Sequence, residues 1–321
     1  MNNNRRMIWV DWMKVIGMYF IVAGHLFPAG YPYIYVFNVP LFFLISGFLF
    51  HNDINMNVFI KKIILNYVLP LFLIRTIMYF WERYIYLDTS QFISISQYWL
   101  FMIKGYQNCN GACWFIYSLI LLRIVFQFMP NKISYIVTFG ILLTIIAYYL
   151  HFKGIHRGNA ILNITVAYQP FAIGVFLKRY KNQLDQYSPS LPSALGLLFF
   201  SILSIAICEK INGEVWVFNN GYGRSFLLYL LGMFNGAVGV YTLSKIFTQF
   251  AQTIIYTLSF GNILTLGFHQ IFVNIINIYM EPMPYFSYIM AIIIILLFYP
   301  IIILCNNRFP ILLGIYRTHK K

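Results

Sequence analysis

Apolar stretches long enough to cross a lipid bilayer recur along the whole chain. Of its 321 residues, 60% are hydrophobic and only 9% are charged, whereas a soluble protein carries about 25% charged residues. Several apolar runs approach or exceed the ~20 residues that a membrane-spanning helix needs. We therefore predict an all-α fold, a polytopic transmembrane helix bundle, that forms a single integral-membrane domain over residues 1–321.

The apolar runs and the polar turns between them predict about ten spans. The expected spans are residues 8–27, 33–50, 63–84, 112–128, 133–152, 161–177, 193–208, 225–247, 255–279 and 285–305. An even number of spans places both termini on the same side of the membrane. Lys and Arg are about twice as frequent in the loops and tails of that side as in the other loops. The positive-inside rule therefore predicts that both termini are cytoplasmic.

The basic charge of the chain does not indicate nucleic-acid binding. The formal net charge is +14, but the basic residues lie in short loops between apolar runs, as in other membrane proteins. No His, Asp and Glu cluster has metal-ligand spacing, so neither a metal nor a bound cofactor is expected. Cys109 and Cys113 could form a disulfide if their loop faces an oxidising compartment; two unpaired thiols are the alternative.

The first apolar run carries three ionisable residues, Asp11, Lys14 and His25. Such residues are costly inside a spanning helix and usually face the bundle interior or a water-filled cavity. At about 100° per residue, Lys14 and His25 differ by roughly 20° around the helix, and Asp11 lies within roughly 40° of His25. The three side chains therefore share one face, with Lys14 and His25 about 16 Å apart along the axis. This spacing predicts a charged pair near one membrane surface and a deeper imidazole.

Two motifs resemble the acyltransferase 3 family, integral-membrane sugar O-acyltransferases that include fucose 4-O-acetylase-like proteins. The first is D-x-x-K followed by ten residues and His, at residues 11–25, where the family usually has Arg in place of Lys14. The second is FNVPLFF at residues 37–43 followed by ISGF at residues 45–48. It is similar to the family's F-H-x-P-L-F-F and S-G-F/Y pattern, with Asn38 where many relatives have His. Looser likenesses extend over nearly the whole chain.

The resemblance implies that His25 is the general base of an O-acyl transfer. Histidine titrates near neutrality, which suits the removal of a proton from a sugar hydroxyl as it attacks an acyl carbonyl. A structural His bonded to a neighbouring span is the alternative. Lys14 is predicted to bind the phosphates of coenzyme A or to hold the thioester, and Asp11, one turn away, to position Lys14. Snorkelling of Lys14 to the membrane surface and an ordinary interfacial pair are the alternatives.

Four further residues are predicted to line the substrate site. Asn38 and Ser46 could donate hydrogen bonds to the substrate or to a carbonyl oxygen, although helix packing through small residues explains Ser46 equally well. Trp114 could stack on a sugar or on adenine, or belong to an interfacial aromatic belt. His269 is a second candidate for the polar face of the bundle, with a structural role as the alternative.

Two arginines, Arg75 and Arg123, fall within predicted spans. Each should pair with an acidic group or reach an anionic substrate. Few acidic residues are available inside the spans, and Glu82 is the nearest candidate. This shortage favours an anionic ligand, so both arginines are also predicted to line the substrate site.

Together these features predict a membrane-bound O-acyltransferase of the cell envelope, specifically an O-acetyltransferase in the plasma (inner) membrane. It would move the acyl group from acyl-CoA, with acetyl-CoA as co-substrate, to a hydroxyl of a cell-surface glycan or a lipid-linked sugar precursor. The alternative is a transporter or flippase for an anionic lipid-linked sugar, which Arg75 and Arg123 would suit. A glycan polymerase or ligase would be expected to carry a larger outer loop.

Overall fold

Helices form all the regular secondary structure in the part of the chain that is described. The computed structural model describes residues 6–86, 93–155, 158–279 and 285–315, and every named element in these ranges is helical. The all-α prediction is therefore confirmed.

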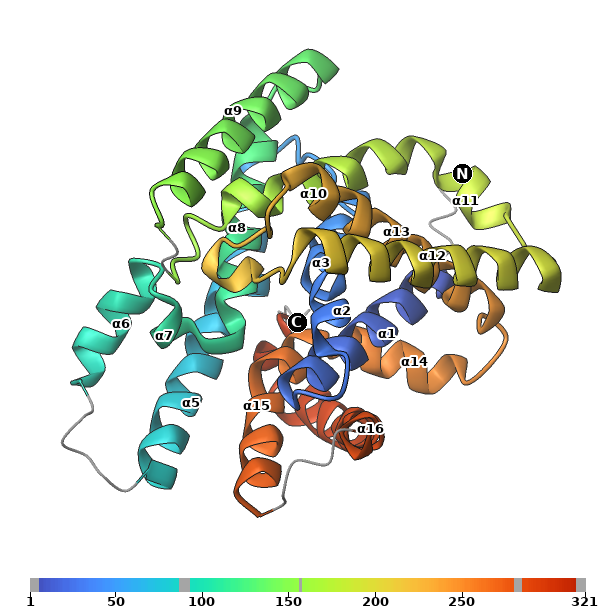
Figure 1. Ribbon diagram of the computed structural model, residues 1–321. Helices are drawn as coiled ribbons and strands as arrows, with labels where there is room; N and C mark the ends of the chain where they lie inside the picture. Colours follow the sequence, from blue (N-terminus) through green and yellow to red (C-terminus); the bar gives the residue numbers. More distant parts are fainter. Residues whose placement is uncertain (1–5, 87–92, 156–157, 280–284, 316–321) are drawn as a thin grey trace.

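The helices follow one another in the order of their labels in Figure 1. The α-helices are α1 (Ile8–His25), α2 (Tyr31–Tyr35), α3 (Asn38–Phe48), α4 (Met56–Ile63), α5 (Leu69–Tyr86), α6 (Ile95–Ile103), α7 (Gln107–Asn110), α8 (Trp114–Phe128), α9 (Ile133–Phe152), α10 (Ile164–Leu177), α11 (Lys181–Gln186), α12 (Leu191–Asn212), α13 (Phe226–Ile246), α14 (Gln252–Phe260), α15 (Asn262–Tyr279) and α16 (Phe286–Arg308). Short 3-10 or π segments are η1 (Ile64–Val68), η3 (Gly111–Cys113), η4 (Lys178–Tyr180), η5 (Val217–Asn219) and η6 (Pro310–Leu313).

Within the described residues, 7 helical segments are long and apolar enough to cross a membrane, or up to 8 if the bent pair α14 and α15 counts as one span. The chain is thus a multi-pass membrane protein, but the predicted count of about ten spans is not confirmed. Two expected spans are missing from this set, for different reasons. Helix α10 has only 14 residues, and the polar residues of α1 lower its mean hydropathy.

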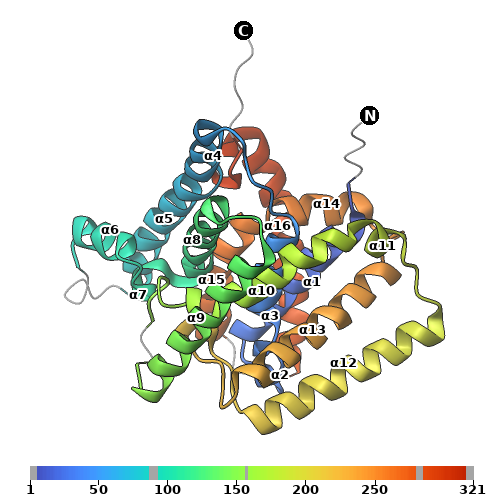
Figure 2. The same cartoon turned by 90° about the horizontal axis from the view of Figure 1, so that it is seen from above.

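Helix α1 lies in the middle of the bundle. It contacts α3, α13, α14, α15 and α16, and Figures 1 and 2 both show α1 and α3 well inside the molecule, with α5 and α6 at one edge. Neighbours on so many sides leave α1 little lipid-facing surface. Its ionisable residues can therefore lie against other helices, as the cost of placing charge in lipid requires.

Helices α14 and α15 form a sharply bent pair. They meet at an angle of 81°, where the sequence predicted one continuous span over residues 255–279. Gly261 lies between them, and a Cβ atom there would lie 2.2 Å from Ile302 Cδ1 of α16, so any larger residue would push α16 away. The bend brings α14 and α15 against different parts of α1.

The crossing of α3 and α10 depends on two glycines. A Cβ atom at Gly47 would lie 1.9 Å from the backbone oxygen of Phe171, and one at Gly174 would lie 2.0 Å from the backbone oxygen of Leu44. Backbone atoms cannot turn away as a flexible side chain can. Small residues at such crossings let two membrane helices approach closely, and here they fix the position of α3 in the bundle.

We expect Gly47→Ala or Gly174→Ala to destabilise the purified protein by about 3 kcal/mol, because an added methyl group would force the two backbones apart. Gly196→Ala is the matched control, since nothing lies within 4 Å of a Cβ atom at that position of α12. Thermal unfolding in detergent measures all three variants. Unfolding temperatures for the α3 and α10 variants equal to that of Gly196→Ala would contradict this packing.

Candidate functional site

Two pockets lie one above the other along α1. The first, the His25 pocket, has a volume of about 200 Å³ and also contains Asn38 and Trp114. These three residues lie at helix ends: His25 is the last residue of α1, and Asn38 and Trp114 are the first residues of α3 and α8. The structure therefore brings together three of the predicted site residues.

His25 faces a second histidine, His269 of α15. The two ring centroids lie 5.0 Å apart. His269 Nδ1 lies 3.1 Å from the carbonyl oxygen of Thr265 and 2.9 Å from that of Leu266, so Nδ1 carries the proton and Nε2 is left with a lone pair. Among the described residues, this buried Nε2 has no hydrogen-bond partner. The His25 ring forms no hydrogen bond within the same part of the chain, and its contact with His269 is between the two rings.

A loop segment that the sequence did not indicate closes the His25 pocket. Val215, Trp216, Val217 and Phe218 line it, although they lie between the expected spans 193–208 and 225–247. The main chain of Trp216 is held by reciprocal bonds with Gly221, of 3.0 and 2.9 Å. Four consecutive apolar residues within a polar loop are the signal that could have identified this segment.

The second pocket, the Lys14 pocket, has a volume of about 210 Å³ and contains Lys14, Ser46 and Arg123. Among the described residues, no hydrogen bond or ion pair engages the Lys14 ammonium group. Arg123 lies between two rings, with its Cζ 5.4 Å from the centroid of Phe50 and 5.2 Å from that of Tyr67, and its buried Nε lacks a hydrogen-bond partner there. No lining residue is acidic, so two cations without acidic partners face one cavity.

Asp11 is not bonded to Lys14 in the described structure. Its carboxylate accepts a hydrogen bond of 2.6 Å from Ser259 Oγ of α14 and one of 2.5 Å from Arg6 Nε. The amide of Asn262 also lies 3.5 Å from the backbone oxygen of Lys14. Asp11 therefore joins α14 to α1, and it adjoins the Lys14 pocket through Ser259, which lines that pocket.

Arg75 lies outside both pockets. The residue is only 2% exposed, and its side chain donates hydrogen bonds to the backbone oxygen of Cys109 at 3.0 Å and to the Tyr98 hydroxyl at 2.7 Å. It also pairs with Glu82 at 3.4 Å, the acidic residue that the sequence suggested. Arg75 therefore fixes α6 and α7 against α5. Cys109 is a free thiol, as is Cys113.

Comparison with known proteins agrees with this arrangement. The model of the acyltransferase 3 family, described as an acyltransferase domain, matches residues 7–305. The chain belongs to the acyltransferase 3 family. No curated protein and no solved structure matches it. The family match and the membrane helices show a membrane acyltransferase. Every residue that lines the two pockets lies within the matched range.

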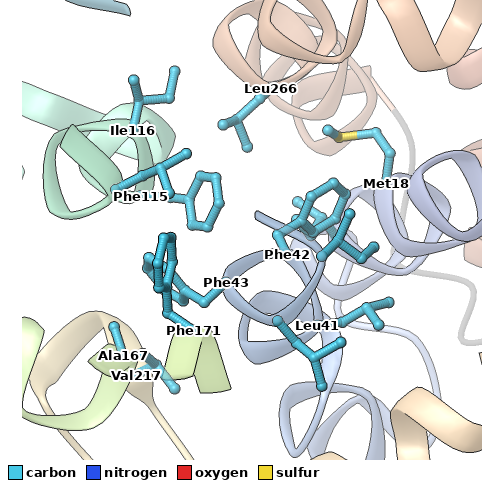
Figure 3. Close-up of a cluster of buried hydrophobic side chains, with 14 of the residues drawn as sticks. Met18, Leu41, Phe42, Phe43, Phe115, Ile116, Ala167, Phe171, Val217 and Leu266 are labelled. Atoms are coloured by element: carbon cyan, nitrogen blue, oxygen red, sulfur yellow. The ribbon is translucent and has the colours of Figure 1, made fainter. Parts of the chain in front are cut away.

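The two pockets of the acyltransferase are separated by an apolar layer, which consists of Met18, Phe42, Phe115 and Leu266. These four buried side chains come from α1, α3, α8 and α15 and point toward one another (Figure 3). The Phe42 and Phe115 ring centroids are 5.9 Å apart. Each of α1, α3 and α8 passes from one pocket through this layer to the other. Lys14 and His25 therefore lie in different pockets of the same helix face.

The two intramembrane arginines should differ in their effect on stability. We expect Arg75→Gln to destabilise the protein by about 3 kcal/mol, because it leaves the buried Tyr98 hydroxyl and Cys109 carbonyl oxygen without their charged partner. Arg123→Gln should cost only about 1 kcal/mol, since it removes contacts with aromatic rings alone. Thermal unfolding of the two purified variants compares them directly. Equal stability of Arg75→Gln and wild type would show that the Arg75 contacts do not hold α6 and α7.

Proposed function

We propose that this acyltransferase moves an acyl group, most simply acetyl, from acyl-CoA to a hydroxyl of a cell-surface glycan or of its lipid-linked precursor. We place it in the plasma membrane with both termini cytoplasmic, as the distribution of basic residues in the loops favours. The proposal is based on the positions of two polar residues that share one face of α1 but lie in different pockets. Lys14 and His25 line separate pockets on α1, about 16 Å apart along the helix.

The Lys14 pocket suits the donor. Its two cations, Lys14 and Arg123, have no acidic neighbour in the lining, so a negatively charged ligand can bind without displacing an internal ion pair. The rest of the lining is largely apolar and fits the uncharged arm that carries a thioester. Ser46 is placed to donate a hydrogen bond to an oxygen of that arm.

The His25 pocket suits the acceptor. Trp114 and Trp216 present aromatic surfaces, against which the apolar face of a sugar ring can pack. Asn38 adds an amide within the same lining. An amide both donates and accepts hydrogen bonds, as sugar hydroxyls do. Such a pocket combines a few polar groups with apolar walls, as ligand sites generally do.

The reaction requires one base and no covalent enzyme intermediate. The neutral His25 ring removes the proton from the acceptor hydroxyl while the hydroxyl oxygen bonds to the thioester carbonyl carbon. The carbon–sulfur bond then breaks, and the coenzyme A thiolate receives the proton from the His25 imidazolium. The products are the O-acyl ester and free coenzyme A. His269 would act as a positioning residue, since its Nε2 lone pair lies in the same histidine pair.

A transporter of an anionic lipid-linked sugar has less support than it had from sequence. The transporter hypothesis was based on two intramembrane arginines. One of them, Arg75, is already bonded to Tyr98, Glu82 and the Cys109 carbonyl oxygen. Only Arg123 is left facing a cavity.

We expect His25→Ala to reduce acyl transfer by about 100-fold or more, because general-base catalysis contributes roughly that factor. The measurement is transfer of radiolabelled acetyl from acetyl-CoA to membrane glycan, with wild-type protein and each variant at equal abundance in the membrane. His151→Ala is the matched control, since His151 lies in the last turn of α9 and does not line either pocket.

Wild-type rates in His25→Ala would refute the assignment of the base. If neither wild type nor the variants transferred label from acetyl-CoA or from longer acyl-CoA donors, the donor class itself would be wrong.

A further inference from the structure

A third cavity, here called the basic pocket, lies where the ends of α3, α8 and α10 meet. Its volume is about 420 Å³, and its polar lining consists of His51, Asn52, Asn131, Lys178 and Arg179. None of the residues that line it is acidic. The predicted catalytic machinery does not use this cavity.

The hydrogen-bond donors of the basic pocket can bind a ligand that accepts hydrogen bonds. Lys178 Nζ donates to the backbone oxygen of Phe50 and lies 3.4 Å from His51 Nδ1. With an ammonium group as donor, His51 Nδ1 is the acceptor, so the ring proton lies on Nε2. Among the described residues, no hydrogen bond or ion pair engages the guanidinium group of Arg179. Its planar set of N–H donors matches the oxygens of a phosphate.

Among the described residues, no acidic side chain lines the basic pocket to neutralise its positive charge. The nearest acidic residue along the chain, Asp53, forms an ion pair with Lys62. Burial, and after it the nearby Lys181 ammonium, lower the pKa of Lys178, so its charged form lacks a compensating negative charge. A bound anion would supply that charge, so the pocket favours a negatively charged ligand.

The basic pocket lies on the Lys14 side of the bundle, away from His25. Phe50 belongs to its lining, and the Phe50 ring is also the one that lies 5.4 Å from Arg123 Cζ in the Lys14 pocket. At the same end of α3, the Phe48 ring packs at 5.4 Å against Trp9, near the start of α1. Phe50 therefore links the basic pocket, which it lines, to Arg123, which lines the Lys14 pocket.

We propose that the basic pocket binds phosphate groups, with Arg179 as the principal ligand and Lys178 and His51 in support. Phosphate esters near this membrane surface have two sources, the nucleotide end of a coenzyme A donor and the headgroup of an anionic lipid. The first source rests on the proposed function; the second does not. A donor held here by its phosphates would direct its uncharged arm past Phe50 into the Lys14 pocket.

The test uses the full-length protein in nanodiscs of zwitterionic lipid. Calorimetry measures the affinity for coenzyme A and for pantetheine, which lacks the phosphates. Native mass spectrometry with added phosphatidylglycerol measures retention of anionic lipid. Arg179→Gln is compared with Arg308→Gln, a matched variant in the last turn of α16 that does not line the basic pocket.

If coenzyme A is the source, Arg179→Gln should weaken its binding by about 10-fold or more, as expected for loss of a charge-assisted hydrogen bond, and leave pantetheine binding unchanged. If lipid is the source, Arg179→Gln should lose phosphatidylglycerol and keep its affinity for coenzyme A. Arg308→Gln should change neither.

Equal binding of coenzyme A and of phosphatidylglycerol by Arg179→Gln and wild type would overturn the phosphate site, even if wild-type protein transfers acetyl normally. Absence of both coenzyme A binding and acetyl transfer in the wild type would instead overturn the proposed donor, while the lipid measurement would still decide the basic pocket. Wild-type protein that binds neither ligand would overturn both.

Discussion

The cost of placing ionisable groups in a membrane governs the arrangement around α1. Asp11, Lys14 and His25 lie on one helix, and lipid contact is unfavourable for all three. The bundle accordingly surrounds α1 with α3, α13, α14, α15 and α16. Each polar group then meets a different environment: Asp11 is bonded to Ser259 and Arg6, while Lys14 and His25 line cavities.

Two features of the backbone make this arrangement possible. The glycine crossing at Gly47 and Gly174 lets α3 lie close to α10, which places Asn38 and Ser46 on the two levels of the site. The 81° bend between α14 and α15 sends Ser259 to the start of α1 and His269 to its end.

An apolar layer lies between the level of Lys14 and the level of His25. Met18, Phe42, Phe115 and Leu266 pack together (Figure 3), and they line the Lys14 pocket but not the His25 pocket. In the proposed reaction, a thioester bound beside Lys14 would have to pass these side chains to reach His25, so its access to His25 would depend on movement of side chains.

Sequence alone predicted the parts of the site that depend on local periodicity. The helical spacing placed Lys14 and His25 on one face of α1, and the motif around Asn38 and Ser46 indicated α3. Contacts between segments that are far apart in the sequence could not be predicted in this way. Ser259 is the partner of Asp11 from 248 residues away, and no local pattern marks it.

Hydropathy did not predict the bend at Gly261 between α14 and α15, because it measures the length of an apolar run but not its direction. An arginine inside a span can either pair with groups of the protein or face a site where a ligand binds. Only the fold showed that Arg75 pairs within the protein and that Arg123 faces a cavity.

The central claim is that donor binding and base catalysis occupy separate levels of α1. The most direct test measures acetyl-CoA binding and acetyl transfer in parallel for Lys14→Met and His25→Gln. We predict that His25→Gln binds acetyl-CoA like wild type but transfers almost no acetyl. Lys14→Met should bind acetyl-CoA about 10-fold more weakly, a loss of about 1.4 kcal/mol of binding free energy. Loss of acetyl-CoA binding in His25→Gln, or wild-type binding in Lys14→Met, would contradict the central claim.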